Sequence, residues 1–288
     1  MQTDCSPEKW LVCFEHTGVY GWSLSCYLSE KKIKYSIQSA LHIKRSLGIQ
    51  RGKNDNQDAR AIARFAYLHR KEIKLTTLPS KTLISLRNLL SYRERLVKSK
   101  VSLHVSAREL AVHTEPDLHA IIVNDSKKNI RGLVQSIKEV DKKIKSVIGQ
   151  DPQLKKLMDL STSVTGVGLQ VAANLLVCTE GFTRFENWRK FSCYCGLAPF
   201  EYQSGSSIRG KTRVSPMGNQ KIKALIGNGV ASAIQWDPEL ATYYHRKIKE
   251  GKPKMVVQTA VKNKIISRVF ATVKRGTPFV PLFTFAQP

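Results

Sequence analysis

Apolar residues near the start of the chain form short runs separated by turns, a pattern typical of alternating strands and helices. The run at residues 10–14 predicts a buried strand, and residues 34–38 predict a second one. Residues 20–29 between them have helical spacing. A further helix is predicted over residues 55–69, where apolar side chains recur at helical intervals. We therefore expect an α/β domain over residues 1–75.

Residues 80–150 have a different pattern. The first half has a leucine at every seventh position, and between Ile130 and Val147 the apolar residues step alternately by three and four. Such spacing is typical of coiled-coil seams. Because Pro116 cannot lie in the middle of a helix, we predict two long helices, folded as a hairpin or presented to a partner chain. The alternative is a pair of amphipathic helices packed on one globular core.

The third part of the chain, residues 155–276, is predicted to be mainly helical. It contains Val164-Thr-Gly-Val-Gly168 in front of a helix rich in Ala and Leu, and a loop rich in Gly, Ser and Arg at residues 203–218. A basic helix follows at residues 255–274. The expected organisation is an α/β domain (1–75), a coiled-coil helical segment (76–152), a mainly α domain (153–277) and an apolar tail (278–288).

The composition adds a strong positive charge. The 288 residues include 47 Lys and Arg against 22 Asp and Glu, a net charge of +25. This excess indicates a polyanionic partner. Nucleic acid fits better than a membrane, because no apolar run approaches the ~18 residues of a spanning helix. Residues 1–7 lack the pattern of a signal peptide, and the six cysteines form no CxxC pair, so we expect a cytoplasmic bacterial protein without structural zinc.

Two carboxylates mark the start of the helix predicted at residues 55–69. Asp55 and Asp58 are three residues apart, so their side chains can share one face of the helix. Close carboxylates repel each other unless a cation lies between them, and oxygen ligands suit Mg²⁺ or Mn²⁺. The alternative is a helix cap with Asp55 at the N-cap. Glu15 favours the metal, because it directly follows a predicted strand, where catalytic acids of α/β folds lie.

Two motifs carry a resemblance to a known family. Glu15-His-Thr-Gly-Val-Tyr20, followed by Lys53-Asn-Asp-Asn-Gln-Asp-Ala59, resembles the N-terminal domain of the DEDD transposases, the insertion-sequence 110 family of bacterial mobile elements. The resemblance implies a RuvC-like (RNase H-like) fold in which four acids bind Mg²⁺. Glu15, Asp55 and Asp58 match the second, third and fourth acids. The first has no match, so we expect an incomplete domain that lacks its first strands and has unpaired sheet edges.

The loop at residues 203–218 lies among further family motifs. Gly196-Leu-Ala-Pro199, Gln203-Ser-Gly205 and Gly218-Asn219 resemble the G-L-A-P, S-G and G-N blocks of the family's C-terminal transposase domain. The resemblance implies that Ser204 is the nucleophile. A hydroxyl is a weak nucleophile and needs positive charge around the phosphate, which nearby Arg and Lys side chains can supply. Without the family, Ser-Gly in such a loop indicates only a turn.

Basic residues are candidate contacts to nucleic-acid phosphates. Together they predict binding that weakens steeply as salt is added. The candidates are Lys53, Arg209, Lys211, Arg213, Lys221, Lys223, Lys262 and Arg268. Gly166 and Gly168 are open to two interpretations. They form either a helix-hairpin-helix turn that offers backbone N–H groups to phosphate or a close contact between helices.

The resemblance extends from about residue 9 to residue 277 and implies a reaction. Ser204 attacks a DNA phosphate and forms a phosphoserine link, while Glu15, Asp55 and Asp58 hold Mg²⁺. Family members assemble as dimers and tetramers through the middle helices and choose their DNA with a structured guide RNA, called a bridge RNA. Two alternatives are an inactive remnant that only binds DNA or RNA, which the missing first acid favours, and a metal-dependent RuvC-like nuclease.

Overall fold

The computed structural model describes residues 10–18, 20–48, 54–110, 113–201, 203–204, 208–210 and 212–281, with the backbone alone at residues 204, 208 and 209. The chain divides into two compact units, residues 1–79 and 80–288, which we describe separately. Within the described ranges, no helix combines the length and the apolar character that a membrane span requires. The cysteines described there are free.

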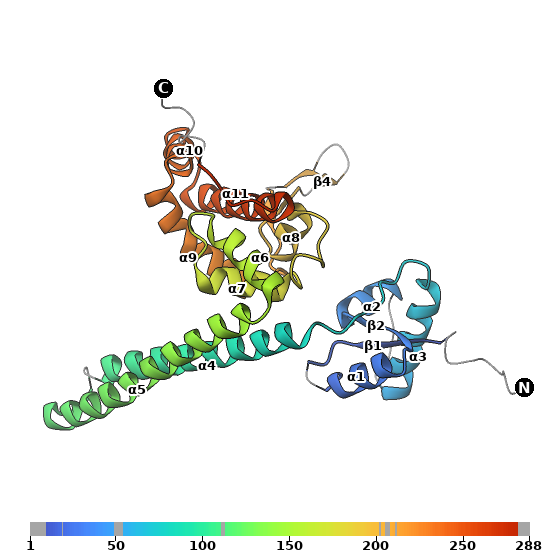
Figure 1. Ribbon diagram of the computed structural model, residues 1–288, viewed down its shortest axis with the longest axis horizontal. Coiled ribbons are helices and arrows are strands. Elements are labelled where there is room, and N and C mark those ends of the chain that lie inside the picture. Colours follow the sequence, from blue (N-terminus) through green and yellow to red (C-terminus); the bar gives the residue numbers. More distant parts are fainter. Residues whose placement is uncertain are drawn as a thin grey trace, which may run out of the picture. The chain divides into compact units, whose positions relative to one another are not determined.

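The N-terminal unit is a small α/β fold (Figure 1). Strand β1 (Leu11–Glu15) pairs in parallel with β2 (Lys34–Gln38). Helix α1 (Trp22–Glu30) connects them, because parallel neighbours need a crossover connection. Helices α2 (Ala40–Ser46) and α3 (Asp55–Leu68) complete the unit. The strands and helices predicted between residues 10 and 69 are therefore confirmed.

The two edges of this sheet differ. Along β2, Thr76 donates its backbone N–H to the carbonyl of Tyr35 (2.8 Å), and its Oγ1 accepts the N–H of Ile37 (3.0 Å). Among the described strands, β1 pairs with β2 alone. Beside β1 lies an apolar groove of about 410 Å³, lined by Leu11, Cys13 and one face of α3. The α/β class is thus observed, and the assignment to a RuvC-like fold stays a prediction.

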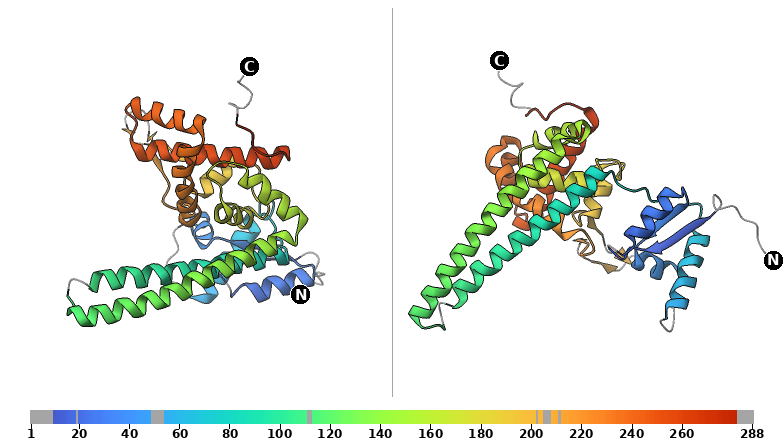
Figure 2. Two further views of the ribbon diagram at one scale, coloured as in Figure 1. Left: turned by 60° about the vertical axis from the view of Figure 1, so that its left-hand side comes forward. Right: turned by 60° about the horizontal axis from the view of Figure 1, so that its bottom comes forward.

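The C-terminal unit begins with a helical hairpin. Helices α4 (Lys81–Glu109) and α5 (Pro116–Gly149) run side by side in opposite directions (Figures 1 and 2). Pro116 is the first residue of α5, a position where its missing N–H is not needed. The predicted pair of helices and the break between them are confirmed. Leu86 and Ile144 lie in the buried halves of the hairpin, whereas the far halves expose apolar side chains.

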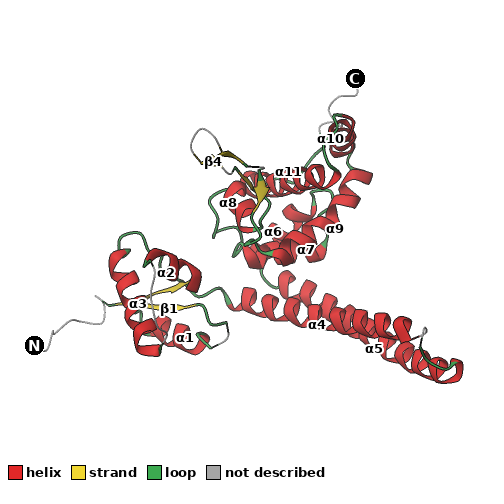
Figure 3. Cartoon of the chain, turned by 180° about the vertical axis from the view of Figure 1, so that it is seen from behind, coloured by secondary structure: helices red, strands yellow, loops and turns green. Residues whose placement is uncertain are grey.

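Further helices complete this unit, and short strands lie between two of them in the part of the chain that the structure describes (Figure 3). The helices are α6 (Pro152–Thr162), α7 (Leu169–Cys178), α8 (Trp188–Tyr194), α9 (Gln220–Trp236), α10 (Pro238–Lys249) and α11 (Lys254–Arg275). The helices predicted after Gly168 and at residues 255–274 are therefore present as α7 and α11. The hairpin shares one apolar core with α7, α9 and α11. A single core thus contains residues from both of the predicted segments, 76–152 and 153–277.

Gly166 shows how closely the backbone before α7 approaches α9. Its φ of +89° lies in the left-handed region. A Cβ on Gly166 would lie 2.6 Å from the carbonyl oxygen of Gly229, and a Cβ on Gly229 would lie 2.1 Å from that of Gly166. Neither position can hold a side chain without moving the backbone. Of the two interpretations of this turn, the geometry supports the close contact between helices.

Candidate functional site

Helix α3 begins with two exposed acids. Asp55 and Asp58 both lie in its first turn, near the positive end of the helix dipole. The cap of the helix is Asn54, whose Oδ1 accepts the backbone N–H of Gln57 (2.8 Å). The alternative of Asp55 as the N-cap is therefore wrong by one residue. Because Asn54 performs the capping, that role does not explain the two acids.

Glu15, Asp55 and Asp58 are the predicted metal ligands, and all three lie in the described part of the chain. No group of three or more described His, Cys, Asp or Glu residues is placed to hold a metal ion. Glu15 ends β1 opposite Gln38, while Asp55 and Asp58 begin α3. The Mg²⁺ or Mn²⁺ site expected from these acids therefore stays a prediction, and the reaction proposed below contains no step through a metal. Lys53, the predicted phosphate contact near these acids, lies outside the described residues.

The loop that carries Ser204 leaves and re-enters the helical core at one place. Gly196, with a φ of +66°, follows α8, and Gly218 precedes α9. A Cβ on Gly218 would lie 2.2 Å from the backbone nitrogen of Gly196, so no side chain fits there. Asn219 donates its backbone N–H to the carbonyl of Tyr194 (2.8 Å) and its side-chain amide to the Tyr194 hydroxyl (3.0 Å). The two ends of the loop are thus held together.

Two short ladders organise the loop. Strand β3 (Pro199–Phe200) pairs antiparallel with β6 (Arg213–Val214). Between them, β4 (Gln203–Ser204) pairs with β5 (Ile208–Arg209). The backbone of Ser204 therefore lies in the inner strand pair, and the strands of the outer pair precede and follow it along the chain.

The outer ladder also brings a positive charge to the loop. Arg213 lies directly opposite Phe200, and both side chains are exposed. Directly opposite residues of an antiparallel pair have their side chains on one face. The side chains of Ser204 and Arg209, and the whole of Lys211, lie outside the described residues.

Lys223 of α9 and Lys262 of α11 bring two like charges together. The Lys262 side chain passes over Gly227, where an added Cβ would lie 3.2 Å from its Nζ. Burial lowers the pKa of Lys262, and the positive charge of Lys223 lowers it further. Neither lysine takes part in an ion pair among those the structure describes. A bound phosphate would relieve their repulsion, which keeps both as candidate nucleic-acid contacts.

Lys221 is engaged by a carboxylate of the protein. Its Nζ lies 2.6 Å from Glu94, which also contacts Lys98 at 2.9 Å. Hydrogen bonds from these two lysines lower the pKa of Glu94. Lys221 thus ties α9 to α4, and a phosphate would have to compete with Glu94 for it.

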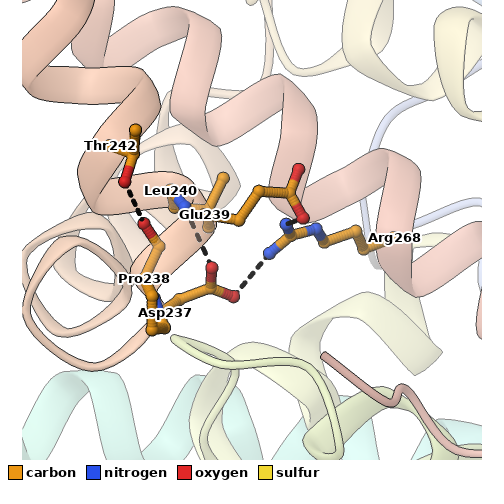
Figure 4. Close-up of polar contacts among 6 residues, drawn as sticks. All are labelled: Asp237, Pro238, Glu239, Leu240, Thr242 and Arg268. Carbon is orange, nitrogen blue, oxygen red and sulfur yellow. Dashed lines mark hydrogen bonds and ion pairs between the residues drawn. The ribbon is translucent and has the colours of Figure 1, made fainter. Parts of the chain in front are cut away.

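Arg268, a predicted nucleic-acid contact, is paired with two acids of the protein. Its guanidinium contacts Asp237 and Glu239, at 2.6 Å each (Figure 4). Asp237 is 4% exposed and also caps α10 by accepting the N–H of Leu240 (2.9 Å). The ring of Phe279 covers the guanidinium at 4.7 Å. The positive charge of Arg268 is therefore neutralised by carboxylates of the protein itself.

Two residues of this site could not be predicted from the sequence. Asn263 of α11 donates its side-chain amide to the carbonyl of Leu197 (3.2 Å), at the start of the serine loop. No spacing in the sequence marked Asn263, because it lies about 200° around the helix from the buried Val261 and Ile265. Its partner is also 66 positions away along the chain. Phe200, which is 49% exposed, gave no signal, since its pairing with Arg213 depends on the folded loop.

Comparisons with known proteins agree with the motifs. Residues 158–245 match the family model described as the transposase IS116/IS110/IS902 family. Residues 3–116 match a second model, described as a transposase, for the DEDD domain of the IS110 type. The two matches together cover more than half of the chain and reach both compact units.

The chain is also similar to curated proteins from three bacteria. Two are named pilin gene-inverting protein, from Moraxella bovis and Moraxella lacunata, and each is 27% identical over 272 residues, which are 93% of this chain and 81% of the relative. The third is the insertion element IS110 uncharacterized 43.6 kDa protein of Streptomyces coelicolor, which is 33% identical over 121 residues, 42% of this chain and 30% of the relative.

Proposed function

Since this chain belongs to the IS116/IS110/IS902 family of transposases, we propose that it breaks and rejoins DNA with Ser204 as the nucleophile. The observation that carries the proposal is the closed loop. Gly196 and Gly218 meet at its base, and the backbone of Ser204 lies in the hairpin above them. A nucleophile on a fixed backbone needs less reorganisation to reach a phosphate. DNA inversion, which the names of the Moraxella relatives state, requires the same breaking and rejoining of strands.

In the proposed reaction, the Ser204 oxygen attacks a DNA phosphorus atom. A bond forms between Oγ and phosphorus while the bond between phosphorus and one sugar oxygen breaks. The proton of the serine hydroxyl ends on the departing sugar oxygen, directly or through solvent. A sugar hydroxyl of a second DNA end then makes the reverse exchange and releases the serine. Arg213, exposed on the same loop, stabilises the negative charge that develops on the phosphate.

A covalent adduct is the test of this proposal. Purified protein is incubated with the DNA ends of its element and with the element's non-coding RNA, and the mixture is denatured in detergent and separated on a gel. We expect a labelled protein–DNA adduct that survives denaturation. We also expect a sample without the RNA to form far less adduct at the specific ends, because the resemblance implies a bridge RNA. Salt-sensitive DNA binding without any adduct would contradict the proposed reaction.

An inactive protein that only binds DNA or RNA is the second candidate. The observation that favours it is that Glu15, Asp55 and Asp58 form no three-residue metal group among the described residues. The remaining alternative is a metal-dependent nuclease, which would need these acids together. The adduct experiment distinguishes the candidates, because the inactive protein gives binding alone and a nuclease gives cut DNA without an adduct.

Lys223 and Lys262 are proposed phosphate contacts. The DNA-binding constant falls as salt is added. Replacing both lysines with alanine is expected to make the slope of its logarithm against log salt less steep by about 2, because each phosphate contact contributes about 0.9 to the steepness. Fluorescence anisotropy with labelled duplex, over a range of salt concentrations, measures the slope. The control is Lys142→Ala with Lys143→Ala, which removes the same charge from exposed positions of α5. An equal change of slope in the control would show that only the net charge matters.

We further propose that two copies associate through the far half of the hairpin, as the predicted coiled coil. A groove of about 260 Å³ lies there between the helices, lined by Val101, Val105, Ile130 and Val134. Val101 is 50% exposed, and Val105 is 42% exposed. A second helix that covers this groove would bury apolar surface that water now contacts.

Charges placed in this groove are expected to break the association. With Val101→Asp and Val105→Asp together, the dissociation constant is expected to rise by at least about 100-fold, because a charge buried without a partner is strongly unfavourable. Sedimentation equilibrium measures the change, and circular dichroism checks that the helices persist. Ser102→Asp, at an exposed position between the two valines, is the matched control. If the double variant and the control have the same mass in solution, this surface is not the interface.

A further inference from the structure

Leu197, at the root of the serine loop, is held through both of its backbone polar groups. Its side chain is fully buried. Its N–H donates to the carbonyl of Ser192 (2.9 Å), and its carbonyl accepts the side-chain amide of Asn263 (3.2 Å). From Leu197 the chain passes directly into β3 and then into β4, which contains Ser204. The position of Leu197 therefore sets where the loop begins.

Two unusual atoms lie beside this root. In the part of the chain that the structure describes, Ser192 Oγ and Asn263 Oδ1 are the buried side-chain atoms without a hydrogen-bond partner. Both belong to residues that bond to Leu197. A buried polar atom without a partner lowers stability, so an amide is a poor choice here for stability alone. The Asn263 amide N–H donates to the carbonyl of Leu197, and an apolar side chain could not make this hydrogen bond.

The surroundings of Asn263 on α11 connect the root to the basic surface. The buried positions of this helix are apolar except for Thr272, and the half-buried Asn263 lies between Val261 and Ile265 in the sequence. The preceding residue is Lys262, which lies over Gly227 and near Lys223. One helix thus carries a proposed phosphate contact and, in the next residue, the anchor of the serine loop.

We propose that Asn263 is a positioning residue, which holds the root of the loop so that Ser204 is in place for attack on DNA. The proposal rests on the proposed function of Ser204. Asn263 acts through the Leu197 carbonyl and touches neither DNA nor the reacting atoms. Its loss should leave DNA binding intact and slow the chemical step, because a small displacement of a nucleophile is enough to reduce its rate strongly.

Hydrogen–deuterium exchange tests the anchoring without any need for activity. In Asn263→Ala, amides of residues 193–201 are expected to exchange about fivefold faster than in the unmodified protein, the effect of one lost hydrogen bond on local opening. Asn174→Ala is the matched control, because Asn174 is also a helical asparagine in the C-terminal unit but donates its amide to the carbonyl of Gln170 within α7 (2.8 Å). Unchanged exchange in Asn263→Ala, or equal acceleration in the control, would overturn the proposal.

Single-turnover kinetics then separate positioning from binding. At saturating DNA, Asn263→Ala is expected to form the Ser204 adduct at least about tenfold more slowly, with the Kd for DNA unchanged within about threefold. If Asn174→Ala slows adduct formation by the same factor, the slower rate reflects a general loss of stability, and the proposal is overturned. If the unmodified protein forms no adduct, the proposed function fails, and the exchange experiment alone decides the role of Asn263.

The variant Asn263→Asp adds a test by pH. Only a hydrogen bond from residue 263 to Leu197 predicts that hydrogen exchange at the loop root depends on the protonation of the new carboxyl group. The ionised carboxylate cannot donate to the Leu197 carbonyl, whereas the protonated carboxyl can. Relative to the unmodified protein at each pH, exchange of the loop root in this variant is therefore expected to be faster at high pH and to return toward the unmodified rate as the pH falls. Relative exchange that stays the same across the titration would contradict the proposed hydrogen bond.

Discussion

Replacement of Ser204 by alanine is expected to abolish the covalent protein–DNA adduct and to leave DNA binding intact. Alanine has no oxygen with which to form the ester to phosphorus, so the adduct rate should fall by at least about 10³-fold. The hairpin should persist, because β4 and β5 pair through backbone groups. The measurement is the amount of adduct that survives denaturation, together with the Kd for the same DNA and the melting temperature.

Two neighbouring serines provide the controls for this experiment. Ser206→Ala and Ser207→Ala make the same chemical change in the same loop and should both retain the adduct. Mass spectrometry of the digested adduct should assign the DNA to Ser204. An adduct that survives Ser204→Ala, or that disappears in one of the controls instead, would move the nucleophile to another residue. Retained adduct in all three variants would remove the serines of this loop from the reaction.

Replacement of Arg268 by methionine is expected to cost about 3–5 kcal/mol of unfolding free energy, the usual effect of removing one partner of a buried ion pair. The reason is Asp237, which is 4% exposed and would lose its partner cation. Glu239 would lose the same partner, although it is far more exposed. Methionine preserves much of the apolar contact with Phe279. Urea denaturation of the unmodified protein and the variant measures the difference.

A second charge on the same helix serves as the control for Arg268. Lys274→Met, at an exposed position of α11, is expected to change the unfolding free energy by no more than about 0.5 kcal/mol. Adding Asp237→Asn to Arg268→Met should recover part of the loss, because the unpaired carboxylate is removed while a cap for α10 remains. An Arg268→Met variant of normal stability but weakened DNA binding would instead restore Arg268 as a nucleic-acid contact.

Much of the local structure could be predicted, because it depends on residues a few positions apart. The strand predicted at residues 34–38 is β2, and the break predicted at Pro116 is the point where α5 begins. The capping of α3 was displaced by a single residue, from Asp55 to Asn54. The family was equally readable, since its motifs are short strings such as the one from Gly196 to Pro199.

The candidate site depended on contacts that spacing along the chain cannot report. The net charge of +25 indicated a polyanionic partner, but it could not show that Arg268 is neutralised by Asp237 and Glu239. The motifs identified Glu15 and the two aspartates of α3 as candidate metal ligands. They could not show whether these acids lie close together, and the described residues contain no group of three possible metal ligands.

By itself, the amino-acid sequence determined the elements, the family and the candidate nucleophile. Only the tertiary structure decided that Gly218 touches Gly196, and that Asn263 reaches Leu197 across 66 positions of sequence. The physical reason is the range of the interactions. Helical and strand periodicity follows from neighbours along the chain. Which polar groups pair, and which stay free for DNA, is decided by how the helices pack across a shared core.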